Sequence, residues 1–286
     1  MSRIVYVNGE YAPEEAAKIS IFDRGFIFGD GVYEVVPVVA GKLVDRDYFL
    51  ERLDRSLSEL SITWPCSQRE YLDIIRGLIS RNKLEEGFVY SQVTRGIADR
   101  DFVFPADTAP SLVAFTSQMN LLNNPLAESG IAVSTSEDIR WKRRDIKSVN
   151  LLAQCLAKQD AHSKGADEGW MVEDGFVTEG VTSSAYIVKE RKVITRPLSN
   201  SILPGIRRRT LIEIAEREGI ELEQRLFTLE EALQADEAFI SSATTITLPV
   251  VSIDGEKIAD GIPGKITGKL RKIYIKRLLE EASNSE

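Results

Sequence analysis

Lys147 is the residue whose setting in this sequence most suggests chemistry. Apolar residues recur at helical spacing from Val149 onward, Ser148 could cap such a helix, and Gly165 could end it. The sequence therefore predicts that Lys147 lies at a strand-to-helix junction. The partial positive charge of a helix N-terminus disfavours a second cation, so this position would favour the neutral, nucleophilic amine.

Lys147 also has a non-catalytic interpretation, as part of a solvent-exposed run of basic residues. Lys142, Arg143 and Arg144 precede it closely, and most such runs are surface. The spacing alone leaves both interpretations open.

A second candidate site is an anion site at the start of a helix predicted for 206–218, which Leu203-Pro204-Gly205 precedes and Gly219 ends. The first turn contains three consecutive arginines, 207–209, which is the wrong sign for that end of a helix dipole. An anion bound there would turn the repulsion into attraction, and phosphate is the natural candidate. The strand predicted at 239–245 ends in hydroxyl residues and offers a second phosphate contact.

Four other side chains could take part in chemistry, and each also has an ordinary structural interpretation. Arg52 lies beside the apolar stripe of a helix predicted for 47–60 and would more often be a surface charge. Tyr33 on a strand could be a core aromatic with a satisfied hydroxyl. Arg100 lies between two aspartates and could be neutralised locally or bind an anion, whereas Glu179, in a predicted loop, would be solvent-exposed in most proteins.

Composition describes an ordinary globular chain of 286 residues, 43% of them hydrophobic, for which length suggests about two domains. A net charge of −8 argues against general binding to nucleic acids or anionic membranes, because both require a positive field. No apolar run approaches the roughly 20 residues of a membrane span. We expect a cytoplasmic protein.

The chain contains too few histidine and cysteine residues for several common kinds of catalytic site. Cys66 and Cys155 are the only cysteines, and Cys155 is predicted to be a small core residue on the apolar face of its helix. With His162 as the single histidine, the sequence supports no zinc or other metal site, no Ser-His-Asp triad and no Cys-His pair. An enzyme of this composition would rely on lysine, carboxylates, tyrosine and arginine, helped by a cofactor.

Local signals predict a strand-rich order with few helices. An Asn-Gly turn at 8–9 marks a hairpin, and Ser67 opens a capping box. We expect a small N-terminal domain at 1–118, a linker rich in turn formers at 119–129, and a large domain at 130–286. The predicted elements are strands 4–7, 35–38, 88–95, 112–117 and 131–135, helices 47–60, 67–78 and 206–218, and a hairpin at 170–177.

Four separated motifs agree with one family pattern. They read R-W-x-R-x-D-I-K-S-x-N-L-L, V-T-E-G-x-x-S-S, L-P-G-I-x-R and F-x-S-S-x-T. With them the chain resembles the fold type IV pyridoxal-phosphate enzymes, most closely the D-amino acid aminotransferases, from Tyr6 to about Gly255. The resemblance implies an α+β or α/β fold in which a small α/β domain and a larger barrel-like domain hold pyridoxal 5′-phosphate between them.

The resemblance also implies roles around the cofactor. Lys147 would form the internal Schiff base and then, as a free amine, move the proton between the substrate Cα and the cofactor C4′. Glu179 would pair with the pyridine nitrogen and keep it protonated. The implied neighbours of the phosphate are Arg52, the backbone N–H groups of Ile206 and Arg207, and Ser183, Ser242, Ala243 and Thr244.

For the substrate, the resemblance implies that Tyr33 and Arg100 bind the carboxylate, with Arg100 supplied by the partner subunit of a homodimer. Phe28, Val35 and Phe102 would complete the pocket. Two positions depart from the family. Its Arg-x-His pair is Arg100-Asp101-Phe102 here, so one carboxylate donor is missing, and Ala243 stands where relatives usually carry threonine, which leaves Ser242 and Thr244 to share the hydroxyl contact.

The implied activity is transamination of D-amino acids with a keto acid such as 2-oxoglutarate or pyruvate, through pyridoxamine phosphate in the half-reaction, with slow acceptance of (R)-1-phenylethylamine. Branched-chain L-amino acid aminotransferases, aminodeoxychorismate lyases and (R)-amine transaminases share the fold and remain alternatives. The D-I-K-S context together with Tyr33 and Arg100 favours the D-specific branch. A non-catalytic anion-binding dimer is the alternative from another class, and intact Lys147, Glu179 and Arg52 disfavour it.

Overall fold

The computed structural model describes residues 2–284, which divide into two compact units. The first unit comprises the chain up to 120, residues 146–150 and the chain from 278 onward, and the second comprises 121–145 and 151–277. The segment that carries Lys147 is therefore part of the first unit, whereas the division predicted from the sequence placed it in the second. A short helix, α4 (Leu126–Ser129), forms within the segment predicted as a linker.

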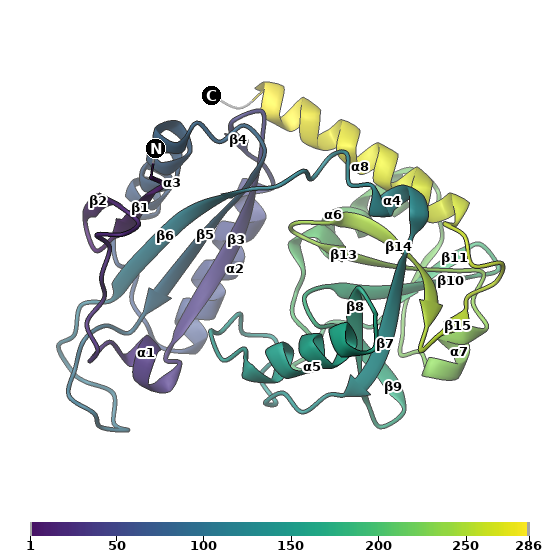
Figure 1. The fold of residues 1–286 in the computed structure, drawn as a ribbon, viewed down its shortest axis with the longest axis horizontal. Coiled ribbons are helices and arrows are strands. Elements are labelled where there is room, and N and C mark those ends of the chain that lie inside the picture. Colours follow the sequence, from purple (N-terminus) through teal and green to yellow (C-terminus); the bar gives the residue numbers. More distant parts are fainter. Residues whose placement is uncertain (1, 285–286) are drawn as a thin grey trace. The chain divides into compact units, whose positions relative to one another are not determined.

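The first unit is built on a six-stranded antiparallel sheet with the order β2-β1-β6-β5-β3-β4 (Figure 1). The predicted Asn-Gly hairpin is confirmed, because Asn8 and Gly9 have φ angles of 46° and 105° between the first two strands. The strands are β1 (Ile4–Val7), β2 (Glu10–Pro13), β3 (Gly31–Val39), β4 (Lys42–Leu43), β5 (Gly87–Thr94) and β6 (Ser111–Gln118).

Two amphipathic helices pack on this sheet, α2 (Arg46–Glu59) on β3 and α3 (Gln68–Asn82) on β1 and β6. Their buried apolar side chains recur at the predicted spacing, for example Leu53 and Leu57 on α2. The predicted capping box is confirmed: Ser67 accepts a hydrogen bond from Glu70 N, and the Glu70 carboxylate accepts one from Ser67 N. α3 continues past the predicted end at residue 78. A one-turn helix, α1 (Arg24–Phe28), precedes β3.

The second unit contains a nine-stranded mixed sheet with the order β12-β11-β10-β13-β14-β7-β8-β9, and β15 pairs with β14. β7 is parallel to both β8 and β14, whereas β13 is antiparallel to both β10 and β14. β9 also contacts β10, so the sheet curls on itself. This confirms the expected architecture of a small α/β domain plus a larger barrel-like domain. The strands are β7 (Ile131–Glu137), β8 (Glu168–Glu173), β9 (Phe176–Gly180), β10 (Ser184–Lys189), β11 (Lys192–Thr195), β12 (Leu222–Gln224), β13 (Glu237–Ser242), β14 (Ile246–Ile253) and β15 (Glu256–Lys257).

The inside of the curled sheet forms the main core of the second unit, around Trp170, Phe227 and the aliphatic residues of β7, β13 and β14. The helices of this unit are α5 (Leu152–Ser163), α6 (Ile206–Arg217) and α7 (Leu229–Leu233). α8 (Lys265–Asn284) was not predicted, and its residues from Leu278 onward group with the first unit. No helix of the described chain is long and apolar enough to cross a membrane.

The helix after Lys147 differs from its prediction at its start and on its buried face. α5 begins at Leu152, and Ser148 does not cap it. Gly165, with a φ angle of 76°, follows the last helical turn as predicted. The apolar stripe does not form a core: Leu152 is 75% exposed and Cys155 is exposed, so the prediction of a buried Cys155 is wrong. The buried face is narrow and carries Ala157 and Ala161, because small side chains let the helix lie close against β8.

Candidate active site

Backbone hydrogen bonds fix Lys147 alongside β3. Tyr33 N donates to Lys147 O at 3.0 Å, and Val149 N donates to Gly31 O at 3.1 Å. Lys147 N also donates to Ser56 Oγ of α2 at 3.4 Å. Lys147 thus lies on a strand-like segment, and α5 begins five residues later, so the prediction that a helix N-terminus adjoins it is wrong.

The Lys147 side chain lies against Tyr33, which the sequence had named as a separate candidate. Its Nζ is 4.0 Å from the centroid of the Tyr33 ring, within the range of a cation–π contact. Tyr33 stacks on Tyr90 at 5.6 Å between centroids, and Tyr90 stacks on Phe115 at 4.8 Å. Through this row of rings the sheet limits where the Tyr33 ring can lie, and with it the amine.

Arg52 is buried and paired, so the interpretation of it as a surface charge is wrong. Its Nε donates to Glu34 Oε1 at 2.8 Å and its Nη2 donates to Oε2 at 2.7 Å. Both side chains are shielded from solvent, with exposed fractions of 7% and 0%. A bidentate pair of this kind fixes the plane of the guanidinium. Glu34, one residue after Tyr33 on β3, was not singled out from the sequence.

Glu179 is a buried residue of β9, so the expectation of an exposed loop carboxylate is also wrong. Arg140 Nη1 donates a short hydrogen bond to Glu179 Oε1, and Leu203 N donates to Oε1 and Oε2 at 3.3 and 3.2 Å. Burial raises the pKa of the Glu179 carboxyl, while the nearby Arg140 guanidinium opposes that shift. The carboxylate is therefore held in a fixed orientation by charge and by the backbone.

Arg140 belongs to a network of buried charges centred on Asp138. Arg140 Nη2 donates to Asp138 Oδ2 at 2.7 Å, and Thr178 Oγ1 donates to the same oxygen at 2.7 Å. Arg144 donates to both oxygens of Glu173 at 2.8 Å. Burial raises the pKa of Asp138, but its interactions with Arg140, Thr178 and Arg144 together outweigh burial and lower that pKa. Of the basic run before Lys147, Arg144 is buried, Arg143 is half-buried and Lys142 is exposed. Although Arg140 opens the family motif, no role was predicted for it from the sequence.

The start of α6 and the turn after β13 lie together. Gly205, the N-cap of α6, provides no side-chain cap for the first turn. Arg207 turns inward, where its Nη2 donates to Ala243 O at 3.2 Å and its guanidinium lies 4.9 Å from the centroid of the Tyr274 ring. The arginine side chain therefore joins the two segments predicted to contact a phosphate.

The turn itself concentrates hydroxyl groups. Ser242 Oγ lies 3.3 Å from Thr244 Oγ1 and 3.0 Å from Thr245 Oγ1, and Thr245 was not among the predicted site residues. Ile246, which follows, has a φ angle of 61°, which is strained for a β-branched residue. Such strain costs roughly 1–3 kcal/mol and is concentrated at functional sites.

Three of the predicted substrate residues, Phe28, Arg100 and Phe102, lie together in the first unit. The Arg100 guanidinium lies 5.6 Å from the centroid of the Phe28 ring and 5.5 Å from that of Phe102, and the two rings are 5.5 Å apart. Phe102 is 77% exposed, whereas Val35 is half-buried on β3. Arg100 thus rests on aromatic faces rather than on the flanking aspartates toward which it could swing.

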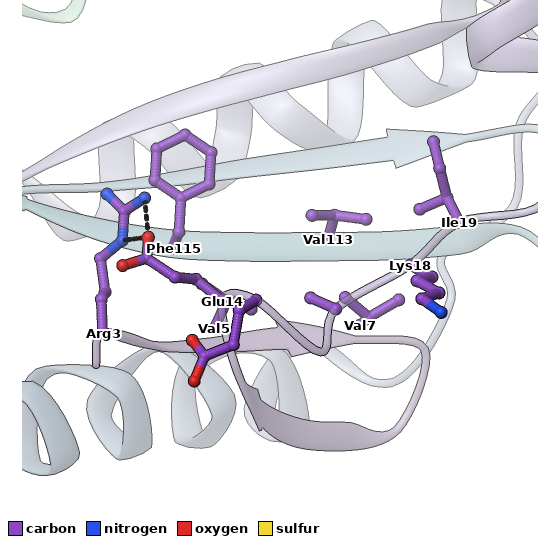
Figure 2. Close-up of a pocket in the computed structure, with 10 residues that line it drawn as sticks. Arg3, Val5, Val7, Glu14, Lys18, Ile19, Val113 and Phe115 are labelled. Atoms are coloured by element: carbon purple, nitrogen blue, oxygen red, sulfur yellow. Dashed lines mark hydrogen bonds and ion pairs between the residues drawn. The ribbon is translucent and has the colours of Figure 1, made fainter. Parts of the chain in front are cut away.

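A separate pocket of about 380 Å³ opens on the first unit and contains none of these residues. Figure 2 shows its floor of Val5, Val7, Val113 and Phe115 beside the ion pair between Arg3 and Glu14. That pair joins Arg3 Nη2 and Glu14 Oε2 at 2.6 Å, so these two charges neutralise each other.

Sequence comparison identifies the family. The model of the amino-transferase class IV family matches residues 31–253, and the chain belongs to this family. It is similar to a D-alanine aminotransferase of Staphylococcus haemolyticus, with 39% identity over 98% of this chain and 99% of the relative.

Solved structures share the fold. The branched-chain amino acid aminotransferase of Escherichia coli has a TM-score of 0.90 and 22% identity, covering 100% of this chain and 97% of that one. A branched-chain amino acid aminotransferase of T.th., solved with pyridoxamine 5′-phosphate, has a TM-score of 0.90 and 23% identity, covering 100% of this chain and 98% of that one. The protein is thus a fold type IV aminotransferase, a class that uses pyridoxal 5′-phosphate.

The residues of this chain fit that cofactor. Ser183 Oγ is buried and has no hydrogen-bond partner among the described residues, so it can donate to or accept from a bound group. A buried carboxylate, an uncapped helix start and a hydroxyl cluster are groups that suit a pyridine nitrogen and a phosphate, and a lysine amine is a group that suits an aldehyde.

Proposed function

We propose that this protein transfers the amino group of D-amino acids to a 2-keto acid such as 2-oxoglutarate or pyruvate. The observation that carries the proposal is the 39% identity to a D-alanine aminotransferase over nearly the whole of both chains. The branched-chain enzymes have the same fold at 22–23% identity, which supports the architecture only.

When bound, pyridoxal phosphate supplies an aldehyde that bonds to amines and a protonated ring that withdraws electrons from the substrate Cα. Lys147 would be the attachment point. Once the substrate amine had taken its place and freed Nζ, the lysine amine would accept the proton from the substrate Cα and return it on the other side of the transferred nitrogen. Its contact with Tyr33 orients the amine. Glu179 accepts the hydrogen bond of the ring nitrogen and holds that proton in place, while Arg140 and Leu203 N keep the carboxylate oriented.

The phosphate is held by groups from four segments. The backbone N–H groups of Ile206 and Arg207 meet it at the start of α6, where the helix dipole favours an anion. The hydroxyls near Ala243 and Ser183 supply further hydrogen bonds, and Arg52 supplies the positive charge, with its plane set by Glu34. The assigned phosphate residues are Arg52, Ser183, Ile206, Arg207, Ser242, Ala243 and Thr244.

The substrate carboxylate is bound by Tyr33 and Arg100, while Phe28, Val35 and Phe102 line the side-chain pocket. Arg100 comes from the partner subunit of a homodimer. Exposed apolar side chains of the first unit support such a dimer, because large ones outside a core commonly mark interfaces. Among the described residues of that unit, the most exposed of these are Ile21, Phe26, Phe102 and Val103.

The proposal also includes the domain boundaries, the unit from which Lys147 acts and the cellular compartment. Residues 119–129 link the two domains, 1–118 and 130–286. Lys147, although it follows the linker, acts from the first unit. The protein works in the cytoplasm, where amino and keto acids are both available.

The test is the visible spectrum of the purified holoenzyme after separate addition of D-alanine, L-leucine and (R)-1-phenylethylamine. We expect conversion of the cofactor band with D-alanine, slower conversion with the (R)-amine and none with L-leucine. Conversion of the cofactor band by L-leucine alone would identify a branched-chain enzyme. Release of pyruvate from aminodeoxychorismate would identify an aminodeoxychorismate lyase. No change with any amine, in a protein that still binds phosphate, would favour the non-catalytic anion-binding dimer.

A further inference from the structure

Arg24 is a buried arginine with a cluster of partners that the proposed mechanism does not use. It is 2% exposed, in the one-turn helix α1, and its Nε donates to Asp30 Oδ2 at 2.8 Å. Arg95, at the end of β5, donates to the same carboxylate from Nε at 2.8 Å and from Nη2 at 3.0 Å. Two buried cations therefore share one carboxylate.

Backbone carbonyl groups stabilise the surplus positive charge. Arg95 donates to Leu60 O at 2.7 Å and to Ser61 O at 3.0 Å, both in the turn after α2. Arg24 instead reaches the loop that carries the proposed carboxylate ligand: its Nη1 donates to Asp101 O at 2.6 Å and lies 3.5 Å from Val103 O. If the loop moved away, a buried guanidinium would lose these partners, and such a loss is costly.

The two carbonyls that Arg24 binds lie on either side of Phe102, and the first directly follows Arg100. The rings are linked as well, because the Phe28 ring lies 4.7 Å from the Arg24 guanidinium and 5.6 Å from that of Arg100. Phe104 covers the other side of the cluster, 3.5 Å from the Arg95 guanidinium and 5.7 Å from that of Arg24. One guanidinium thus holds the backbone and one aromatic neighbour of Arg100.

We propose that Arg24 is a positioning residue for substrate recognition: it fixes the loop backbone at 101 and 103 so that Arg100 and Phe102 are presented in one arrangement to the substrate carboxylate and side chain. The inference rests on the proposed function, in which Arg100 binds that carboxylate. Only a planar fork can bind a carboxylate through Nε and carbonyls through Nη1 at once, so lysine cannot replace arginine here.

The experiment measures steady-state kinetics of the holoenzyme with D-alanine for Arg24→Lys, Arg100→Ala and the double variant. For Arg24→Lys we expect KM to rise about tenfold while kcat stays within about twofold, because a charge-assisted hydrogen bond to the loop is lost and Lys147 is untouched. The double variant should have the KM of Arg100→Ala alone, because Arg24 acts through Arg100. Arg76→Lys, at an exposed arginine of α3, is the matched control and should behave as the wild type.

Hydrogen exchange gives a readout that does not depend on activity. The peptide covering 97–105 should exchange faster in Arg24→Lys, whereas peptides of β3 and β5 should not change. If Arg24→Lys fails to fold, Phe104→Leu is the second variant, because Phe104 is 56% exposed and its ring covers both guanidinium groups. We expect about a threefold higher KM for it.

The outcomes separate the two proposals. An unchanged KM in Arg100→Ala would contradict the proposed role of Arg100. A raised KM in Arg100→Ala together with wild-type KM and exchange in Arg24→Lys would overturn the positioning role alone. Additive effects in the double variant would also overturn it, since they would mean that Arg24 acts independently of Arg100.

Discussion

Arg140 Nη1 donates a short hydrogen bond to Glu179 Oε1 although the two residues are 39 positions apart, and both side chains are buried. Burial raises the pKa of the Glu179 carboxyl, and the charge of the Arg140 guanidinium opposes that shift. With Arg140 as its partner, we expect Glu179 to meet a protonated ring nitrogen as an ion. Arg140 is in turn held by Asp138, so the orientation of the carboxylate depends on a second buried charge.

Glu179→Gln should bind pyridoxal phosphate and transaminate far more slowly, because an amide keeps the shape of the side chain but cannot stabilise a pyridinium by charge. Single-turnover rates with D-alanine measure the effect, and cofactor affinity serves as the control. Near-normal turnover would mean that another group keeps the ring nitrogen protonated.

Lys147→Ala should abolish transamination. The wild-type protein should be yellow, because the Lys147 amine in its neutral form is nucleophilic enough to bond to the aldehyde of the cofactor. Reduction with borohydride should remove the visible band and leave the reduced cofactor attached to the Lys147 peptide. Peptide mass spectrometry after reduction locates the label. A reducible adduct that persists together with activity in Lys147→Ala would remove this residue from the centre of the mechanism.

Arg52 requires a matched variant, because Arg52→Ala would leave Glu34 buried without its bidentate partner, typically costing about 3–5 kcal/mol. In Arg52→Gln/Glu34→Gln the two amides can bond to each other without charge. We expect this protein to fold and to bind pyridoxal phosphate about tenfold or more weakly, since a charged hydrogen bond to the phosphate is lost. Fluorescence titration of the apoprotein gives the affinity. Wild-type affinity in a folded double variant would remove Arg52 from the phosphate site.

Asp138 predicts a pH dependence of stability. Its pKa is lowered in the folded protein, so the folded state binds fewer protons than the unfolded state in acid, and the contribution to stability is lost as pH falls below about 4. Asp138→Asn should reduce the free energy of unfolding by about 3–5 kcal/mol at pH 7, because Arg140 loses a buried partner, and by less toward pH 3. Urea unfolding at several pH values measures this. Exposed Asp47→Asn is the control, and a difference independent of pH would contradict the prediction.

Local signals predicted the secondary-structure elements well, but ion pairs between residues distant in the chain could not be predicted. The Asn8-Gly9 hairpin, the Ser67 capping box and the helix at 206 depend on residues adjacent in the sequence. Arg52 and Glu179 were interpreted as exposed because their partners, Glu34 and Arg140, are distant in the chain. Spacing shows a charge but not the ion that neutralises it after folding.

The same limit applies around Lys147. The sequence identified this residue and Tyr33 separately, and only pairing with β3 brings them into contact. The helix start was misplaced because Ser148 and Val149 pair with β3 before α5 begins, a tertiary preference that overrides helical spacing. Family motifs were more informative than periodicity here, since they carry the result of such long-range contacts.

At Phe102 the chain departs from the Arg-x-His pair of its family. A hydrogen bond to a charged carboxylate contributes roughly 1.5–3 kcal/mol, so a histidine donor at this position should raise the preference for carboxylate-bearing substrates by about one to two decades. Arg100 lies beside both the Phe28 and Phe102 rings, and an apolar residue at 102 also offers a surface to an aryl or alkyl group. We therefore expect the wild type to react with D-alanine and, slowly, with (R)-1-phenylethylamine.

Half-reaction rates for both donors in wild type, Phe102→His and Phe102→Leu test this. Phe102→His should raise the ratio of the D-alanine rate to the amine rate, because a second donor beside Arg100 would stabilise a bound carboxylate and would not stabilise a substrate that lacks one. Phe102→Leu removes the aromatic face without adding a donor and should leave D-alanine nearly unchanged while slowing the aryl amine. If the wild type does not react with the amine, or if Phe102→His leaves the ratio unchanged, Phe102 does not weaken the selection for a carboxylate. Arg100 and Tyr33 would then suffice to select amino acids.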